Sequence, residues 1–270
     1  MVQVERLYNG ILSRMAMRIL ISNDDGYKAP GIIALYLALK EIAQVEVIAP
    51  EHNNSAKSNA LTLQSPIYVH DAENGFKYVT GTPADCVHIA LTGLLDYKPD
   101  LIVSGINNGA NMGDDTIYSG TVGAAMEGFL MGIPAIAFSQ VEKGWKHIDA
   151  AAAKARVIVQ TLMEDQTINS APWLVNVNIP NLPIEKIREI KLCRLGRRHP
   201  AEKVIVQQNP RGETMYWIGS AGSAKDDALD TDFYATSQGH VSLTPLQVDL
   251  TDHDSMPFWT PMVENWDFKK

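Results

Sequence analysis

The stretch that decides the fold is Arg18–Gly26, with the sequence RILISNDDG. Its first five residues form an apolar run that predicts a buried strand, and Asn23-Asp24-Asp25-Gly26 predicts the turn that ends it. Two adjacent carboxylates at the mouth of a sheet repel each other unless a cation lies between them or one takes a proton. A hard divalent ion such as Mg²⁺ or Mn²⁺, which prefers oxygen ligands, removes this repulsion. A solvated Asp-Asp-Gly turn is the alternative, and the dipeptide alone does not decide between the two.

Strands and helices alternate in the chain that follows. Thr82-Pro83-Ala84-Asp85 is a typical helix start, with a capping threonine, a proline at the first position and an aspartate that reaches back. Buried strands are expected at 45–49, 100–104, 134–139 and 173–179, and helices at 31–42, 82–95, 119–131 and 148–163. This alternation predicts an α/β fold, a three-layer Rossmann-like, mostly parallel sheet with helices on both faces.

The chain changes character from about residue 184. Short strands separated by Gly, Pro and Asp are expected at 187–195, 203–208, 214–220 and 239–246, with a hairpin turn at Arg211-Gly212. We therefore expect three parts: residues 1–16, an N-terminal extension of uncertain status; residues 17–183, the Rossmann-like catalytic core; and residues 184–270, a β-rich C-terminal portion. The last part is expected to cover the site or to reach a neighbouring subunit.

The bulk properties are those of an ordinary globular protein. The 270 residues are 46% hydrophobic and 20% charged, and the net charge of -8 argues against nonspecific binding to a nucleic-acid polymer or an anionic membrane. No apolar stretch approaches the roughly 20 residues that span a bilayer. Two distant cysteines exclude a disulfide framework and a zinc cluster, and suit a reducing compartment. No dinucleotide fingerprint, Walker A sequence, His-Glu-x-x-His or Gly-x-Ser-x-Gly is present.

Three polar loops follow the ends of predicted strands and should lie at the same edge of the sheet. They are the Asp24-Asp25 turn, the segment 51–59, and the glycine- and asparagine-rich segment 105–113. Carboxylates, hydroxyls and amides are the ligands of Mg²⁺ or Mn²⁺. Each loop alone is more often an ordinary surface turn. Three of them beside an aspartate pair favour a metal site.

Two further segments offer groups for an anion. Ser119-Gly120-Thr121 opens a predicted helix, where free N–H groups and the helix dipole favour negative charge, although a simple N-cap is an equally good interpretation. Arg197-Arg198-His199 offers positive charge for a phosphate, with a solvated turn as the alternative. A second acidic pair, Asp114-Asp115, has no strand leading directly into it and is assigned to the surface.

Taken together, these motifs resemble the SurE family, the stationary-phase survival proteins. The resemblance extends from Met17 to about Thr251, and the 16-residue leader is the clear departure from it. The first matching block is 19–26 together with 29–32, and the second runs from 47–50 through Ser55 to Ser58-Asn59. The third is 81–87, and the fourth is 103–107 together with Asn111, Gly113, Asp114, Asp115 and 118–122. The similarity continues through 197–200, 216–219 and 241–246.

The resemblance implies a metal-dependent nucleotide phosphatase. One divalent ion per subunit, Mg²⁺ or Mn²⁺, would be bound by Asp24, Asp25, Ser55 and Asn107. Phosphate would be released from nucleoside 5′- or 3′-monophosphates, and short polyphosphate is a further expected substrate. The family resemblance also implies a cytoplasmic protein that forms homodimers or homotetramers through its C-terminal portion, with no membrane and no nucleic-acid polymer as partner.

The mechanistic hypothesis is metal-assisted hydrolysis of a phosphomonoester. Asp24 and Asp25 are the catalytic candidates, and one of them is expected to act as general base, as nucleophile or only as a metal ligand. Ser119, Gly120 and Thr121 are expected to stabilise the phosphoryl oxygens. One rival hypothesis is a signalling receiver domain, which needs a further Asp at a later strand end, whereas the corresponding loop here, Ser104-Gly105-Ile106-Asn107, has none. The other is a nucleotide-binding protein without activity. The preferred base, phosphate position and metal stay open.

Overall fold

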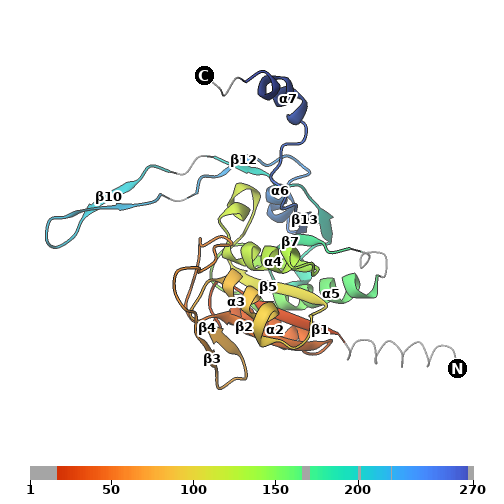
Figure 1. Ribbon diagram of the computed structural model, residues 1–270. Helices are drawn as coiled ribbons and strands as arrows, with labels where there is room; N and C mark the ends of the chain where they lie inside the picture. The colour runs from red at the N-terminus through yellow and green to blue at the C-terminus, as the bar shows by residue number, and fades with distance from the viewer. Residues whose placement is uncertain (1–16, 166–170, 200–201, 220, 267–270) are drawn as a thin grey trace.

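The computed structural model describes residues 17–165, 171–199, 202–219 and 221–266, so the expected extension at 1–16 lies outside the described residues (Figure 1). Nine strands of the described chain form one central sheet. In their order across the sheet they are β3 (Val69–Asp71), β4 (Lys77–Val79), β2 (Gln44–Pro50), β1 (Arg18–Ser22), β5 (Leu101–Asn108), β6 (Ala135–Gln140), β7 (Leu174–Ile179), β13 (Val241–Pro245) and β8 (Ile190–Leu192).

The middle of this sheet is parallel. Strands β4, β2, β1, β5, β6 and β7 each run parallel to the next, whereas β3 is antiparallel to β4 and β13 is antiparallel to β7. The mostly parallel sheet expected from the sequence is confirmed. The hairpin of β3 and β4 at one edge was not expected, because its strands are only three residues long.

Helices cover both faces of the sheet, as expected. On one face, α2 (Pro30–Leu39) and α5 (Ile148–Glu164) pack with Ile19 and Ile21 in one apolar cluster. On the other face, α3 (Pro83–Ile89) and α4 (Gly120–Leu130) pack with Leu20 in a second cluster. Successive residues of a strand point to opposite faces, so a five-residue apolar strand that is buried on both sides contributes to both cores.

The start of α3 follows the predicted capping pattern. The Thr82 hydroxyl accepts a hydrogen bond from the Asp85 N–H at 3.1 Å, and the Asp85 carboxylate accepts one from the Thr82 N–H at 2.8 Å. The two residues thus satisfy each other's free donors at the helix start. The predicted helix continues beyond α3 as a short π-helix, η1 (Ala90–Leu94), rather than as a regular α-helix.

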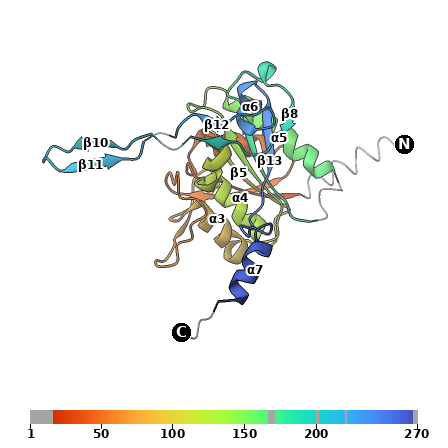
Figure 2. The same ribbon diagram turned by 90° about the horizontal axis from the view of Figure 1, so that it is seen from above.

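The C-terminal portion is divided between the main sheet and two projections. Strands β8 and β13 join the main sheet, and α6 (Asp232–Ser237) packs against β13 and β7. The predicted hairpin is formed by β10 (Ile205–Gln208) and β11 (Thr214–Trp217), and Figures 1 and 2 show it projecting from the body of the molecule. Helix α7 (Met256–Glu264) projects separately in both views. The division at residue 184 stays a prediction.

A small antiparallel pair, β9 (Arg197–Arg198) and β12 (Ala224–Asp226), lies between the hairpin and the body. None of the helices in the described ranges is long and apolar enough to cross a membrane.

Close packing of α4 on the sheet leaves no room for a side chain at Gly128. A Cβ atom at this position would lie 2.4 Å from Ile102 Cγ1 and 2.9 Å from Ile102 Cβ. We predict that Gly128→Ala lowers the free energy of unfolding by about 1–3 kcal/mol, because the clash outweighs the gain in helix propensity. Urea denaturation measures this difference.

Gly93→Ala is the matched control, since a Cβ at Gly93 meets nothing within 4 Å. This variant should unfold at the same urea concentration as the parent protein or at a higher one. A Gly128→Ala variant as stable as Gly93→Ala would contradict the packing described here.

Candidate active site

The strand order reverses at β1, where the chain leaves toward β2 on one side and β5 occupies the other side. In open parallel sheets, ligands bind in the crevice outside the carboxyl ends of the strands at such a reversal. Asp24 and Asp25 follow the carboxyl end of β1, and Asn107 lies at the carboxyl end of β5. The topology therefore places the predicted site at the position that favours ligand binding most.

The turn after β1 is held by its first residue. The side chain of Asn23 is buried, donates from Nδ2 to the Gly26 carbonyl at 2.9 Å and accepts from the Gly26 N–H at 3.2 Å. Gly26 has a φ of +100°, a conformation that favours glycine. These contacts fix the backbone between them, which carries Asp24 and Asp25.

The carboxylate of Asp24 is buried, with 3% of the residue exposed, and it accepts a short hydrogen bond from the Thr121 hydroxyl. Burial raises the pKa of Asp24 to about 6; the Thr121 hydrogen bond opposes the shift and the charge of Asp25 adds to it. The start of α4 approaches so closely that a Cβ at Gly120 would lie 2.8 Å from Asp24 Cβ. Glycine at this position is therefore required by the contact with Asp24.

Asp25 is the point where the three predicted loops meet. Its Oδ1 accepts a hydrogen bond from Asn53 Nδ2 at 3.1 Å, and its Oδ2 accepts one from the Asn108 N–H at 3.0 Å. Burial raises the pKa of Asp25, while these two donors and the charge of Lys143 oppose the shift. The convergence of these loops at one edge, expected from the sequence, is present in the structure.

The remaining predicted metal ligands lie on the same loops. The Ser55 N–H donates to Asn53 Oδ1 at 2.9 Å, which ties Ser55 to the residue that contacts Asp25. Asn107 is half-buried, and its Nδ2 donates to the Gly109 carbonyl at 2.9 Å. Because the amide nitrogen is used in this way, the amide oxygen is the atom of Asn107 left for a ligand.

Among the described residues, no three His, Cys, Asp or Glu side chains are grouped so that they could hold a metal ion. The predicted donor set at this edge is instead two carboxylates, an amide oxygen and a hydroxyl, all of them hard oxygen donors. This chemistry fits Mg²⁺ or Mn²⁺, and it does not fit the nitrogen and sulfur ligands typical of zinc.

The segment Ser119-Gly120-Thr121 uses both of its hydroxyls within the protein. Ser119 Oγ accepts a hydrogen bond from the Val122 N–H at 3.0 Å and so caps α4, while the Thr121 hydroxyl donates to Asp24. Ser119 is therefore the N-cap of α4, as one of the two interpretations expected. Binding of a phosphate by this segment stays a prediction, and the groups it depends on are the backbone N–H groups of the first helical turn.

The loop after β5 is held by contacts that the sequence did not predict. The Asn111 N–H donates to Asn178 Oδ1 at 2.9 Å, and Asn111 Nδ2 donates to Ser139 Oγ at 2.8 Å. Asn176 and Asn178 in turn donate to the Asn111 carbonyl at 2.7 and 2.9 Å. The available signal was the two asparagines that alternate inside the buried strand β7. They anchor the loop that presents Asn107 and the Asn108 N–H.

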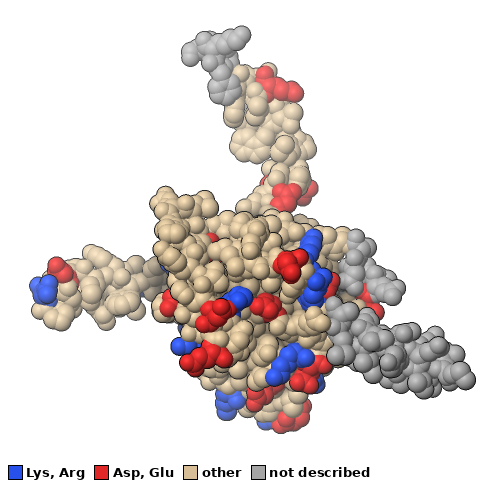
Figure 3. Space-filling model, turned by 60° about the horizontal axis from the view of Figure 1, so that its bottom comes forward, with Lys and Arg blue, Asp and Glu red and all other residues tan. Residues whose placement is uncertain are grey.

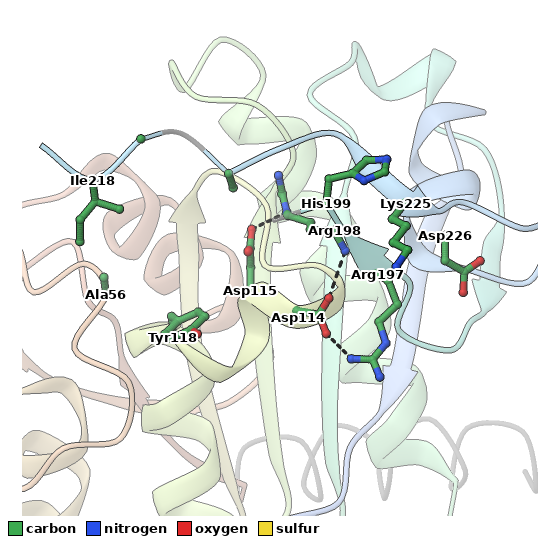
Figure 4. A pocket seen from close by; sticks show the side chains of 12 residues that line it. Ala56, Asp114, Asp115, Tyr118, Arg197, Arg198, His199, Ile218, Lys225 and Asp226 are labelled. Carbon is green, nitrogen blue, oxygen red and sulfur yellow. Dashed lines mark hydrogen bonds and ion pairs between the residues drawn. The ribbon is translucent and has the colours of Figure 1, made fainter. Parts of the chain in front are cut away.

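A cavity of about 1080 Å³ adjoins this site (Figure 4). Asp114 and Asp115 line it from the short 3₁₀-helix η2 (Gly113–Ile117), half-buried rather than on the open surface expected. Arg197 Nη1 donates to Asp114 Oδ1 at 2.5 Å, and Arg198 Nε lies 2.6 Å from Asp115 Oδ2. Each of the two arginines is thus paired with a carboxylate in the cavity wall, and binding of a phosphate by Arg197–His199 stays a prediction.

The chain is similar to known proteins over most of its length. The model of the family described as survival protein SurE matches residues 19–202. The 5′-nucleotidase SurE of Albidiferax ferrireducens is 70% identical over 90% of this chain and 96% of its own. That of Variovorax paradoxus is 68% identical over 92% of this chain and 98% of its own. The crystal structure of the SurE protein from Aquifex aeolicus matches with a TM-score of 0.80 and 40% identity, covering 91% of this chain and 99% of that one.

The hydrogen bond from Thr121 to Asp24 yields a prediction for the metal-free protein. Thr121→Val removes the donor and leaves the buried carboxylate less satisfied. We expect the free energy of unfolding at pH 8 to fall by about 1.5–3 kcal/mol, the range for a hydrogen bond to a charged group. The exposed hydroxyl of Thr92 donates to the His88 carbonyl at 2.7 Å, so Thr92→Val is the matched control, expected within about 0.5 kcal/mol of the parent. Equal stabilities of the two variants would contradict the role assigned to Thr121.

Proposed function

The chain belongs to the SurE family, and on that premise we propose that it is a metal-dependent phosphomonoesterase acting on nucleoside 5′-monophosphates. Nucleoside 3′-monophosphates and short polyphosphate are further proposed substrates. That the chain is an enzyme, a 5′-nucleotidase, rests on relatives of that name about 70% identical to it over nine tenths of its length. The observation that carries the metal-dependent mechanism is the Asp24-Asp25 pair, fixed at the reversal of strand order by three separate segments.

The residues that would hold one divalent ion in each subunit are Asp24, Asp25, Ser55 and Asn107. When bound, Mg²⁺ or Mn²⁺ supplies polarisation of a phosphoryl oxygen and lowers the pKa of a bound water. The raised pKa values of both carboxyls support this assignment, because burial disfavours two adjacent negative charges that no cation balances.

The chain's own groups have separate tasks in this mechanism. The buried carboxylate of Asp24 is held in one orientation by Thr121, and the half-buried Asp25 is held from two sides by Asn53 and Asn108. One of the two carboxylates would accept a proton from an attacking water or attack phosphorus itself, or both would serve only as metal ligands. The Gly120 N–H has no acceptor within α4, and we assign it to the phosphoryl oxygens, whereas the Thr121 N–H serves the Asp24 carboxylate.

We also propose that the protein is a homodimer or homotetramer assembled through its C-terminal portion, and that it acts in the cytoplasm. What supports the assembly is a set of large apolar side chains exposed on the hairpin and on α7. Both of these elements project from the body of the molecule (Figures 1 and 2). The side chains are Ile205, Val206, Tyr216, Trp217, Phe258, Trp259, Met262 and Val263. Exposed groups of large apolar side chains mark sites of protein association. Figure 3 shows few charged side chains on the two projections.

The proposed activity is tested with metal-stripped protein. Phosphate release from a panel of nucleoside monophosphates is measured with and without added Mn²⁺ or Mg²⁺. We expect release only when the metal is added, and we expect Asp25→Asn to reduce it by at least about 100-fold while circular dichroism stays unchanged. Calorimetric titration with Mn²⁺ should show weaker binding in the same variant.

The control is Asp149→Asn, which removes an exposed carboxylate at the start of α5. It should match the parent protein in both measurements. Full activity of Asp25→Asn would contradict the proposed mechanism. Binding of the nucleotides without turnover under any metal would instead support the rival hypothesis of a binding protein.

The proposed assembly is tested by light scattering. Replacing Phe258 and Trp259 together by Ser removes two large exposed apolar side chains from α7. We expect the measured mass to fall from that of a dimer or tetramer toward that of the 29.7 kDa chain. The exposed Leu63, which lies outside the C-terminal portion, provides the control variant Leu63→Ser, expected to leave the mass unchanged. A monomeric parent protein would rule out the assembly.

A further inference from the structure

The cavity in Figure 4 meets the proposed metal site at two points of the chain. Ala56, which lines it, directly follows Ser55, and Tyr118, which also lines it, directly precedes Ser119 at the start of α4. A substrate whose phosphate lies at the start of α4 would therefore extend its remaining part into this cavity. The part of a nucleoside monophosphate that must be accommodated there is the ribose and the base.

Tyr118 offers an aromatic surface in this cavity. The residue is 66% exposed, although its backbone is fixed on both sides. The Tyr118 N–H donates to the Asp115 carbonyl at 3.1 Å, and the Tyr118 carbonyl accepts from the Ser58 N–H at 3.1 Å. An exposed aromatic ring on a fixed backbone is suited to stacking, because little conformational entropy is lost when a flat ligand binds.

The part of the cavity wall next to Tyr118 is built around a buried carboxylate. Asp232 is fully buried and accepts hydrogen bonds from the Gly113 N–H at 2.8 Å and the Gly196 N–H at 2.9 Å. These glycines directly precede Asp114 and Arg197, which pair with each other across the wall. Asp232 thus holds both segments of the wall in place without reaching the cavity itself.

Arg197 and Arg198 are each paired with a carboxylate at close range, whereas Lys225 and His199 also line the cavity. Stacking of a flat group on Tyr118 does not depend on the charge of these side chains.

We propose that this cavity binds the nucleoside part of the substrate, with the base stacked on the ring of Tyr118. The inference rests on the proposed function, which places the phosphate at Asp24 and the start of α4. Stacking uses the face that every base has, so it tolerates different bases and favours the larger purine ring over a pyrimidine. The cavity volume lies at the upper end of the range for small-molecule sites, which also suits a tolerant pocket.

The experiment compares substrates with and without a base. KM and kcat are measured in the presence of Mn²⁺ for adenosine 5′-monophosphate, cytidine 5′-monophosphate and ribose 5-phosphate. Tyr118→Ala should raise KM for the adenosine substrate about 5- to 150-fold, the equivalent of one lost base stack, with a smaller effect for cytidine. The KM for ribose 5-phosphate should stay within about twofold of the parent value, and kcat should change little.

Two further variants make the comparison specific. Tyr118→Phe keeps the ring and should keep the parent KM for every substrate. Tyr68→Ala removes another exposed tyrosine, 59% exposed and outside the cavity lining, and should have no effect. An unchanged KM for adenosine 5′-monophosphate in Tyr118→Ala would overturn the inference, as would an equal loss for ribose 5-phosphate.

Failure of the proposed function gives a different result. The parent protein would then release phosphate from none of the three compounds. In that case calorimetric binding of adenosine 5′-monophosphate to the parent and to Tyr118→Ala decides the inference. Weaker binding to the variant would support the stacking role, and equal or absent binding to both would overturn it.

Discussion

The burial of the Asp24 carboxylate against the start of α4 is the interaction on which the site depends. Removing a carboxylate from water is costly, and the Thr121 hydroxyl and the helix dipole offset only part of that cost, as the raised pKa of Asp24 indicates. The contact is possible because Gly120 has no Cβ. It joins the central strand β1 to the helix layer at the reversal of strand order. The same contact therefore packs α4 against the sheet and positions the carboxylate of the site.

Asp25 complements this arrangement because it is held by loops rather than by a helix. Its two oxygens accept hydrogen bonds from segments that follow β2 and β5, so both loops adopt their positions around it. The loop after β5 is in turn fixed to β7 through Asn111. The Asp24 carboxylate thus belongs to the buried core, whereas the Asp25 carboxylate is hydrogen-bonded to the surrounding loops. A cation between them would relieve the electrostatic cost that both carry, which links metal binding to stability.

The sequence was sufficient for the parts that local chemistry determines. Apolar runs, the Thr82 capping box and the Asp24-Asp25 turn depend on neighbouring residues, and the structure contains all three. The Asn111 contacts with β7 and the pairing of Arg197 with Asp114 were not predictable, because they join residues 65 or more positions apart. Helix α6 lies within a segment whose Gly, Pro and Asp residues indicated only short strands, and α7 lies beyond the last predicted strand.

The two interpretations of Ser119-Gly120-Thr121, an N-cap and a phosphate site, do not exclude each other. The Ser119 side chain accepts from the Val122 N–H, the third of the helix. Of the first two N–H groups, that of Thr121 serves Asp24 and that of Gly120 has no acceptor in α4. Gly120 permits contact with Asp24, and the Thr121 hydroxyl binds it. Tyr118 lines the adjoining cavity (Figure 4). Four consecutive residues therefore connect the carboxylate pair, the proposed phosphate position and the proposed base position, because a helix start places side chains and free N–H groups within one turn.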